Sequence, residues 1–354
     1  MTNIVKKKFN DINLNDHFFD SLKHDYPEFE TIWFPKCIQQ DRDAFVYEDE
    51  EGIGLFAAIK QEDEEIVLYN SAITKNPRLK IATFKIADRL QGQRLGEGAI
   101  AYILWTWQQS PYNEIYLTSY DSHQDLINLF EKFGFEKVGQ KQNGEYVLLK
   151  NNYSFNLFDP YKSFPYISNT ERIISYLPIE EEYHDTLFPY SNLANTEQNR
   201  LDIASANGIT KMYISQGYNL HFHKNDILLM YRKSSLEPKG YHSCITSFCV
   251  VDECKEFIHD YTQIEDIESY IKYVGNKSFF NSEALINQYN TYRNLTVIKM
   301  LYYGFFGEGN NLSYNLLKAN NLWPDSYPTF VRLTMNQFVQ ILKQAKLDPS
   351  KIIR

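Results

Sequence analysis

The order of hydrophobic and polar positions in the first 150 residues predicts a mixed arrangement of strands and helices. Apolar residues at helical spacing indicate helices, and short β-branched or alternating runs indicate strands. The predicted helices cover 16–30, 92–109 and 123–133, and the predicted strands cover 45–47, 54–59, 66–72, 79–86 and 115–118. A hairpin, 135–139 and 146–150, closes this part, with Asn143-Gly144 as its turn.

The pattern changes after residue 150. A stretch rich in turn-forming residues, 151–170, predicts a linker between two domains, 1–150 and 171–354. Beyond it we expect strands at 172–179, 225–233, 243–252 and 295–303, and helices at 182–187, 209–214, 264–273, 282–289 and 335–345. A chain of 354 residues is long enough for two cores of this kind.

Composition narrows the class of protein. Hydrophobic residues make up 43% and charged residues 23% of the chain, which is typical of a folded globular protein. No apolar run approaches the roughly 20 residues of a membrane helix, and the N-terminal residues lack the apolar stretch of a signal peptide. We therefore expect a cytoplasmic protein. Four cysteines without a Cys-x-x-Cys pair favour reduced thiols over a disulfide framework or a metal site.

The net charge of each half of the chain limits the kinds of partner that it can bind. Residues 1–150 hold 17 Lys and Arg against 24 Asp and Glu, and the remaining residues hold 19 against 21. Non-specific binding to nucleic acid depends on neutralising phosphates with Lys and Arg. The balance of charge therefore disfavours a protein that binds nucleic acid tightly and without regard to sequence, although a local basic groove in the second half stays open as an alternative.

The most informative segment is 84–98. An apolar strand runs into a polar turn with glycines, and a helical pattern follows directly. In such a turn several backbone N–H groups point the same way, and the dipole of the helix adds partial positive charge. The segment predicts a site for an anionic group such as a pyrophosphate.

Two motifs carry a resemblance to a known family. The run Gln91-x-x-Arg94-x-Gly96, and about thirty residues later Leu129-Phe-Glu-Lys-Phe-Gly-Phe135, resemble the pyrophosphate loop and the cleft-closing helix end of Gcn5-related N-acetyltransferases (GNAT). The resemblance implies an α/β (α+β) fold with a mixed sheet and flanking helices, acetyl-CoA as cofactor, and N-acetyl transfer as the activity.

The same resemblance assigns cofactor contacts. The backbone of Ile86 and Ala87 is expected to pair with the pantetheine arm. The pyrophosphate loop consists of Gln91, Gly92, Gln93, Arg94, Leu95 and Gly96. Arg94 stands where the family usually has glycine, and we expect it to keep a negative φ, because a side chain is strained at positive φ.

The catalytic positions match the family less well. Phe130 occupies the place of the usual tyrosine acid, and Lys80 that of a frequent glutamate base. Five polar residues at the end of the strand 115–118 could substitute: Thr118, Ser119, Tyr120, Asp121 and His123. Of these, Ser119, Asp121 and His123 are the catalytic candidates, since a histidine exchanges protons near neutral pH. His123 can equally be a solvated residue at a helix start, and positioning of two reactants alone can also accelerate transfer.

A second resemblance concerns the C-terminal half. The strands 225–233 and 243–252 resemble a PUA-like small β-barrel of the ASCH or EVE type, with added helices; an unrelated α+β domain is the alternative. The resemblance implies binding of RNA or a modified base in an aromatic groove. Lys211 and Arg232 are its candidate phosphate ligands. Its candidate aromatic residues are Tyr213, Tyr218, Tyr231, Tyr241, Tyr302 and Tyr303.

Two functions follow from these patterns. The first is an acetyl-CoA-dependent N-acetyltransferase whose second domain recognises the acceptor, an RNA such as a tRNA or a nucleotide-bearing molecule. The second is a GNAT fold without turnover that acts with the PUA-like domain as an RNA-binding or regulatory protein, and it is motivated by Phe130 and Lys80. No metal is expected in either case.

Overall fold

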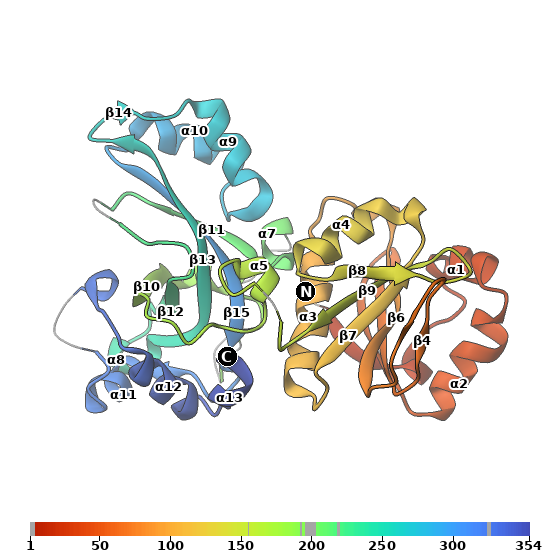
Figure 1. Ribbon diagram of the computed structural model, residues 1–354. Helices are drawn as coiled ribbons and strands as arrows, with labels where there is room; N and C mark the ends of the chain where they lie inside the picture. The colour runs from red at the N-terminus through yellow and green to blue at the C-terminus, as the bar shows by residue number, and fades with distance from the viewer. Residues whose placement is uncertain (1–3, 155, 192, 195–202, 218–219, 324–326) are drawn as a thin grey trace. The chain divides into compact units, whose positions relative to one another are not determined.

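The computed structural model describes residues 4–154, 156–191, 193–194, 203–217, 220–323 and 327–354. They form two compact units, Met1–Phe155 and Asn156–Arg354, each built on its own sheet (Figure 1). Much of the stretch predicted as a linker is structured. The strand β9 ends at Asn151, the helix α5 spans Pro160–Ser163, and Phe164 is buried in the second unit.

The first unit contains a seven-stranded mixed sheet in the order β1-β2-β3-β6-β7-β9-β8. β6 and β7 are parallel, and the other neighbouring strands are antiparallel. The strands are β1 (Val5–Lys8), β2 (Asp43–Asp49), β3 (Gly52–Glu62), β6 (Arg78–Ile86), β7 (Glu114–Ser119), β8 (Glu136–Gln140) and β9 (Tyr146–Asn151). β4 (Ile66–Val67) and β5 (Ala72–Ile73) form a separate ribbon, so the strand predicted at 66–72 is in fact a small hairpin.

Helices cover both faces of this sheet. Figure 1 shows α3 (Leu95–Gln109) and α4 (Gln124–Lys132) on one face, and α1 (Asp20–Asp25) and α2 (Phe34–Gln39) on the other. On the second face a cluster of phenylalanines packs against β2 and β3. Its members include Phe9, Phe18, Phe19, Phe34 and Phe56. The helix predicted at 92–109 begins three residues later than expected, because the polar turn continues to Arg94.

The second unit is built on a mixed sheet in the order β10-β12-β13-β15-β11, with β14 and β16 paired to β13. Its strands are β10 (Ile174–Glu180), β11 (Thr210–Ser215), β12 (Ile227–Lys233), β13 (Cys244–His259), β14 (Thr262–Gln263), β15 (Leu295–Phe305) and β16 (Leu312–Ser313). Its helices are α5, α6 (Glu181–Leu187), α7 (Ala204–Asn207), α8 (Lys239–His242), α9 (Ile267–Val274), α10 (Ser282–Thr291), α11 (Tyr314–Ala319), α12 (Met335–Gln344) and α13 (Pro349–Ile352).

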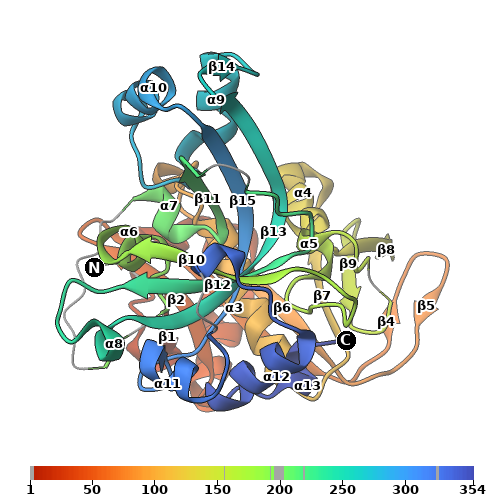
Figure 2. The same ribbon diagram turned by 90° about the vertical axis from the view of Figure 1, so that its left-hand side faces the viewer.

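The predicted small barrel is not found. A barrel closes when its two edge strands hydrogen-bond to each other, but in the described ranges β10 pairs only with β12, and β11 only with β15. β13 and β15 extend together beyond β10 and β12, with β11 along the outer edge of β15, and they carry α9 and α10 at their far end (Figure 2). The segment predicted as a helix at 209–214 is instead the edge strand β11, because it pairs with β15 along its length.

Candidate functional site

The central strands of the first unit separate part of the way along the sheet. β6 pairs with β7 only at Leu79 with Ile115, Lys80 with Tyr116, and Ile81 with Leu117. Within 78–119, all of which the structure describes, no later residue of β6 pairs with β7, although β6 continues to Ile86. We call this divergence the fork.

A bulge at Ala82 explains the fork. In the pairing with β3, Thr83 lies opposite Ala58 and Ile81 opposite Ile59, so Ala82 is an extra residue on β6. A bulge bends the strand that carries it and increases its twist. Leu79 and Ile81 are buried, but every residue from 82 to 87 is partly exposed, which is unusual for the middle strand of a covered sheet. The fork therefore leaves one edge of β6 open to a ligand.

The predicted pyrophosphate loop lies where β6 ends. A single 3₁₀ turn, Asp88–Leu90, follows the strand, Gly92 has a φ of +80°, and α3 starts at Leu95. Gln91, Gly92 and Gln93 are exposed. The amides of Leu95 and Gly96 belong to the first turn of a 15-residue helix, where N–H groups lack an intrahelical acceptor. This end of α3 can therefore accept an anion.

The backbone conformation of Arg94 differs from the one that we expected. Its φ is +61°, in the left-handed region, whereas we expected a negative value. Its guanidinium donates to Oε2 of Glu97 at 2.6 Å, which holds the residue at the start of α3 in the conformation that glycine adopts more easily. The helix start thus keeps the shape of a glycine turn in spite of the side chain.

The two motifs meet in space. Gly96 packs so closely that an added Cβ would lie 2.8 Å from Cδ2 of Leu129 and 3.3 Å from Cδ1 of Ile86. Lys132 contributes Nζ at 2.8 Å from Oε1 of Glu97. Burial by itself raises the pKa of Glu97, but the charges of Arg94 and Lys132 and their hydrogen bonds outweigh it and lower the pKa to about 2. Glu97 is therefore a fixed anion that joins α3 to α4.

The position of the usual tyrosine acid is structural in this chain. Phe130 is fully buried, and its ring makes edge contacts with Phe84 at 5.4 Å and with Phe135 at 5.0 Å between centroids. The neighbouring Phe84 belongs to the open part of β6. Phe130 therefore supports the wall of the fork and offers no proton.

The predicted contacts of Ile86 and Ala87 differ in availability. Ile86 is partly exposed at the open end of the fork. The amide of Ala87 donates to the carbonyl of Gly54 at 2.8 Å, and its carbonyl accepts from Leu90 at 2.9 Å. Of the two residues, Ile86 lies within the open edge.

The three predicted catalytic residues occupy different surroundings. Ser119 is buried at the end of β7, with Oγ 3.4 Å from the carbonyl of Tyr120. Asp121 and His123 are exposed in the single 3₁₀ turn Asp121–His123 that precedes α4. Within 119–123, all of which the structure describes, no hydrogen bond or ion pair joins these three side chains to one another, so their catalytic roles stay predictions.

Sequence reasoning named Thr118 but missed its partner beside the fork, Glu145. Thr118 is the first residue of β7 beyond the shared pairing, and its hydroxyl donates to Oε1 of Glu145 at 3.1 Å. Lys141 and Asn143 also contact the other oxygen of Glu145. Thr118 and Glu145 are 27 positions apart and meet because β7 pairs with β9, so no local signal could have revealed this contact.

Lys80 also has a defined environment. Its ammonium lies 3.9 Å from Oε1 of Glu62 and 5.4 Å from the centroid of the Tyr116 ring. Burial lowers the pKa of Lys80, and the charge of Glu62 works in the opposite direction. Glu62 further accepts hydrogen bonds from Lys60 and Tyr116. Lys80 therefore lies beside the carboxylate of Glu62, in the part of β6 that pairs with β7.

In the second unit, the prediction that Lys211 and Arg232 bind a phosphate is wrong. Lys211 is buried and donates to the carbonyl of Ser205 at 2.6 Å. Arg232 is buried and donates to both carboxylate oxygens of Asp185 at 2.7 and 2.8 Å. Internal acceptors hold both cations, and a phosphate cannot reach them without breaking these bonds.

The predicted aromatic groove is wrong for two of its six members, which are buried. Tyr302 and Tyr303 are buried with their hydroxyls on Ser191 and Ser163. Tyr213 and Tyr231 are partly buried, and Tyr218 lies outside the described residues. Among the predicted rings that the structure describes, Tyr241 is the most exposed, at 68%.

Comparison with known proteins completes the description. No protein-family model matches the chain, and no curated protein is similar to it. The solved structures that resemble part of the chain include three that each match 42% of it: Ard1 from Thermoplasma volcanium (12% identity, 97% of that chain, TM-score 0.33), AtaTR bound with AcCoA (13%, 94%, 0.33), and Arabidopsis thaliana NAA60 in complex with acetyl-CoA (15%, 99%, 0.32). Identities and TM-scores this low assign neither a family nor a ligand to this chain.

Proposed function

We propose that the first unit binds acetyl-CoA in the fork between β6 and β7 and transfers the acetyl group to an amine. The observation that carries this proposal is the sequence of features along β6: a bulge at Ala82, an open edge to Ile86, and a glycine turn that leads into the start of α3. An open strand edge suits a ligand with amide groups, and a helix start suits its phosphates.

The cofactor would lie along β6, with its pyrophosphate at the start of α3 and its thioester toward the bulge. The amides of the pantetheine arm would pair with the backbone between residues 82 and 86, as an added strand does. The pyrophosphate would lie against Gly92 and the amides of Leu95 and Gly96, near the positive end of the α3 dipole. The thioester would then lie close to the bulge, where the edges of β6 and β7 separate.

Acetyl transfer needs two proton movements. The amine nitrogen attacks the thioester carbonyl, the C–S bond breaks, the amine loses a proton, and the departing thiolate gains one. Glu145, oriented by the hydroxyl of Thr118, is our candidate to receive the proton of the amine. His123, Asp121 and Ser119 remain the candidates from the sequence, with His123 as the donor to the thiolate.

The first experiment measures acetyl-CoA binding by calorimetry. Gly92→Asp adds a carboxylate in open space at positive φ, where aspartate is tolerated, and should weaken binding more than ten-fold by charge repulsion. Gly309→Asp is the matched control, since Gly309 has a φ of +76° and equally open surroundings in the second unit. Absence of wild-type binding at millimolar acetyl-CoA, or equal affinity of both variants, would contradict the proposal.

The second candidate function is cofactor binding without turnover. Two observations support it: Phe130 is buried, and Lys80 is paired with Glu62. Position 130 therefore supplies no proton to the thiolate, and position 80 supplies no base for the amine. Release of free CoA thiol in the presence of an amine panel separates the two functions. Tight acetyl-CoA binding without thiol release favours the second candidate.

Recognition of the acceptor by the second unit is a separate part of the proposal. An RNA or nucleotide-bearing acceptor would stack on exposed rings such as Tyr241, because Lys211 and Arg232 are held internally. A mobility-shift assay with total RNA, comparing the wild type with Tyr241→Ala, tests it. Equal shifts of both proteins, or none, would contradict RNA recognition through this ring.

A further inference from the structure

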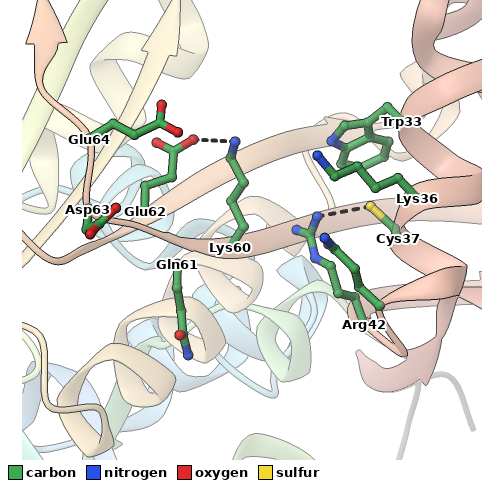
Figure 3. Close-up of a pocket in the computed structure, with 10 residues that line it drawn as sticks. Trp33, Lys36, Cys37, Arg42, Lys60, Gln61, Glu62, Asp63 and Glu64 are labelled. Atoms are coloured by element: carbon green, nitrogen blue, oxygen red, sulfur yellow. Dashed lines mark hydrogen bonds and ion pairs between the residues drawn. The ribbon is translucent and has the colours of Figure 1, made fainter.

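The first unit contains a pocket that the proposed function does not use. It has a volume of about 390 Å³ and lies between α2 and the end of β3 (Figure 3). That volume falls in the range of pockets for small molecules. The lining residues are Trp33, Lys36, Cys37, Gln40, Arg42, Lys60, Gln61, Glu62, Asp63 and Glu64.

Arg42 is held rigidly in one wall. Its Nη1 donates to Sγ of Cys37 at 3.0 Å, its Nη2 donates to the carbonyl of Ile59 at 2.9 Å, and its guanidinium carbon lies 5.8 Å from the ring centroids of both Phe9 and Trp33. Rings on which a guanidinium packs fix its plane. These two bonds use two of its five N–H groups, so three remain for a ligand.

The charge of Arg42 is not neutralised by the residues that hold it. Burial raises the pKa of the Cys37 thiol, against the opposing effect of Arg42, so the sulfur stays neutral. Within the described residues no carboxylate lies within ion-pair distance of Arg42 or of Lys36. In a part of the chain with 24 acidic and 17 basic residues, two cations on one pocket wall without an acidic partner are unexpected.

The opposite wall is acidic. Figure 3 shows the carboxylates of Glu62 and Glu64 across the pocket from Arg42 and Lys36. Glu62 is paired with Lys60, as the figure marks. Glu64 is exposed, and in the described part of the chain its carboxylate has no ion-pair partner. The pocket therefore presents unpaired positive charge on one side and an unpaired negative charge on the other.

We propose that this pocket binds a small molecule that carries both a carboxylate and an amine. Arg42 and Lys36 would bind the carboxylate, since a planar guanidinium matches its two oxygens, and Glu64 would bind the ammonium group. The arrangement selects for a zwitterion because each end meets a charge of opposite sign across one cavity. The inference stands apart from acetyl transfer and does not require it.

The experiment measures the affinities of four probes by calorimetry: 4-aminobutyrate, butyrate, butylamine and inorganic phosphate. We expect 4-aminobutyrate to bind at least ten-fold more tightly than butyrate or butylamine, because each of those probes loses one charged contact, and each contact contributes roughly a ten-fold change. Stronger binding of phosphate than of 4-aminobutyrate, or equal affinities for all probes, would overturn the assignment to a zwitterion.

Variants of the lining residues test whether 4-aminobutyrate binds in this pocket. Lys36→Gln and Glu64→Gln change exposed side chains and should each lower the affinity for 4-aminobutyrate several-fold, and Arg42→Gln should lower it ten-fold or more. Lys23→Gln is the control, since Lys23 pairs with Glu30 outside the pocket. Thermal melting checks that each variant is folded, and acetyl-CoA affinity, measured in parallel, should not change. Full 4-aminobutyrate affinity in Lys36→Gln and Glu64→Gln would overturn the proposal even if Arg42→Gln failed to fold.

Discussion

The Nζ atom of Lys132 lies 2.8 Å from Oε1 of Glu97, and this ion pair joins the end of α4 to the first turn of α3. The two residues are 35 positions apart and belong to the two separate motifs of the first unit. Arg94 binds the other oxygen of the same carboxylate at 2.6 Å. The ion pair therefore positions the helix start at which we propose the pyrophosphate binds.

Glu97→Gln should loosen this helix start. The substitution removes the charge shared by Arg94 and Lys132, and loss of a largely buried, charge-assisted partner costs roughly 1–3 kcal/mol. We expect a lower free energy of unfolding in urea together with weaker acetyl-CoA binding. Glu131→Gln, on the same part of α4, is the control and should change neither quantity. Unchanged stability of Glu97→Gln would show that the ion pair does not hold the two motifs together.

A tyrosine at position 130 should not increase acetyl transfer. Phe130→Tyr places a hydroxyl among the rings of Phe84 and Phe135 in a fully packed site, which costs roughly 1–3 kcal/mol. We expect a lower melting temperature and no increase in CoA thiol release. Phe158→Tyr, at a side chain that is 77% exposed, should leave the melting temperature unchanged. A rise in thiol release would instead assign the tyrosine position to catalysis.

Two glycines of the loop should respond differently to alanine. Gly96→Ala brings a methyl group within 2.8 Å of Leu129 and should destabilise by roughly 1–3 kcal/mol through overpacking. Gly92→Ala meets open space and should cost only the strain of a positive φ, about 1 kcal/mol. Urea unfolding measures both. If packing is the cause, Leu129→Ala should offset part of the loss in Gly96→Ala, and strict additivity of the two losses would contradict it.

In the second unit, Asp185→Asn should be strongly destabilising. Arg232 is buried and bound to both oxygens of this carboxylate, and breaking a buried pair costs roughly 3–5 kcal/mol. Asp260→Asn is the matched control, because the pair of Asp260 with Arg293 is exposed and contributes at most about 1 kcal/mol. Equal losses of stability in the two variants would contradict the importance of burial.

The carboxylate of Asp185 should also make the free energy of unfolding depend on pH in the acid range. Burial raises the pKa of Asp185, but the hydrogen bonds and charges of Arg232 and His184 outweigh it and lower the pKa to about 2. The unfolded chain therefore binds this proton first, so the stabilisation is complete above about pH 4 and is lost as the pH falls toward 2. Unfolding free energies of the wild type should decline over this window, and those of Asp185→Asn should decline less. Parallel pH profiles would remove Asp185 as a cause.

Some features of the first unit follow from local pattern. Apolar spacing predicted α3, α4 and most of the strands, because helices and half-buried strands repeat at different periods. The glycine turn after β6 was also predicted, since glycine is favoured where φ is positive. Arg94 shows the limit of this reasoning. Its positive φ is supported by the bond to Glu97 within the folded helix start, and residue type alone favoured the opposite sign.

The segment 209–214 marks a similar limit in the second unit. A short window of mixed residues suits either a helix or a strand, and pairing with β15 decided for the strand. The closed barrel was predicted from two strands that do exist, β12 and β13. Closure depends on contacts between the two ends of the sheet, which the pattern within each strand does not encode.

Residue order along the chain therefore accounts for the strand, glycine turn and helix start in the first unit, because these depend on neighbours within a few positions. Folding in three dimensions decided the fork at Ala82, the meeting of Thr118 with Glu145, and the enclosure of Lys211 and Arg232. Each of these depends on pairing or burial between distant segments. The packing of distant surfaces decides whether a cation faces a ligand or a buried carbonyl. Composition does not determine that packing.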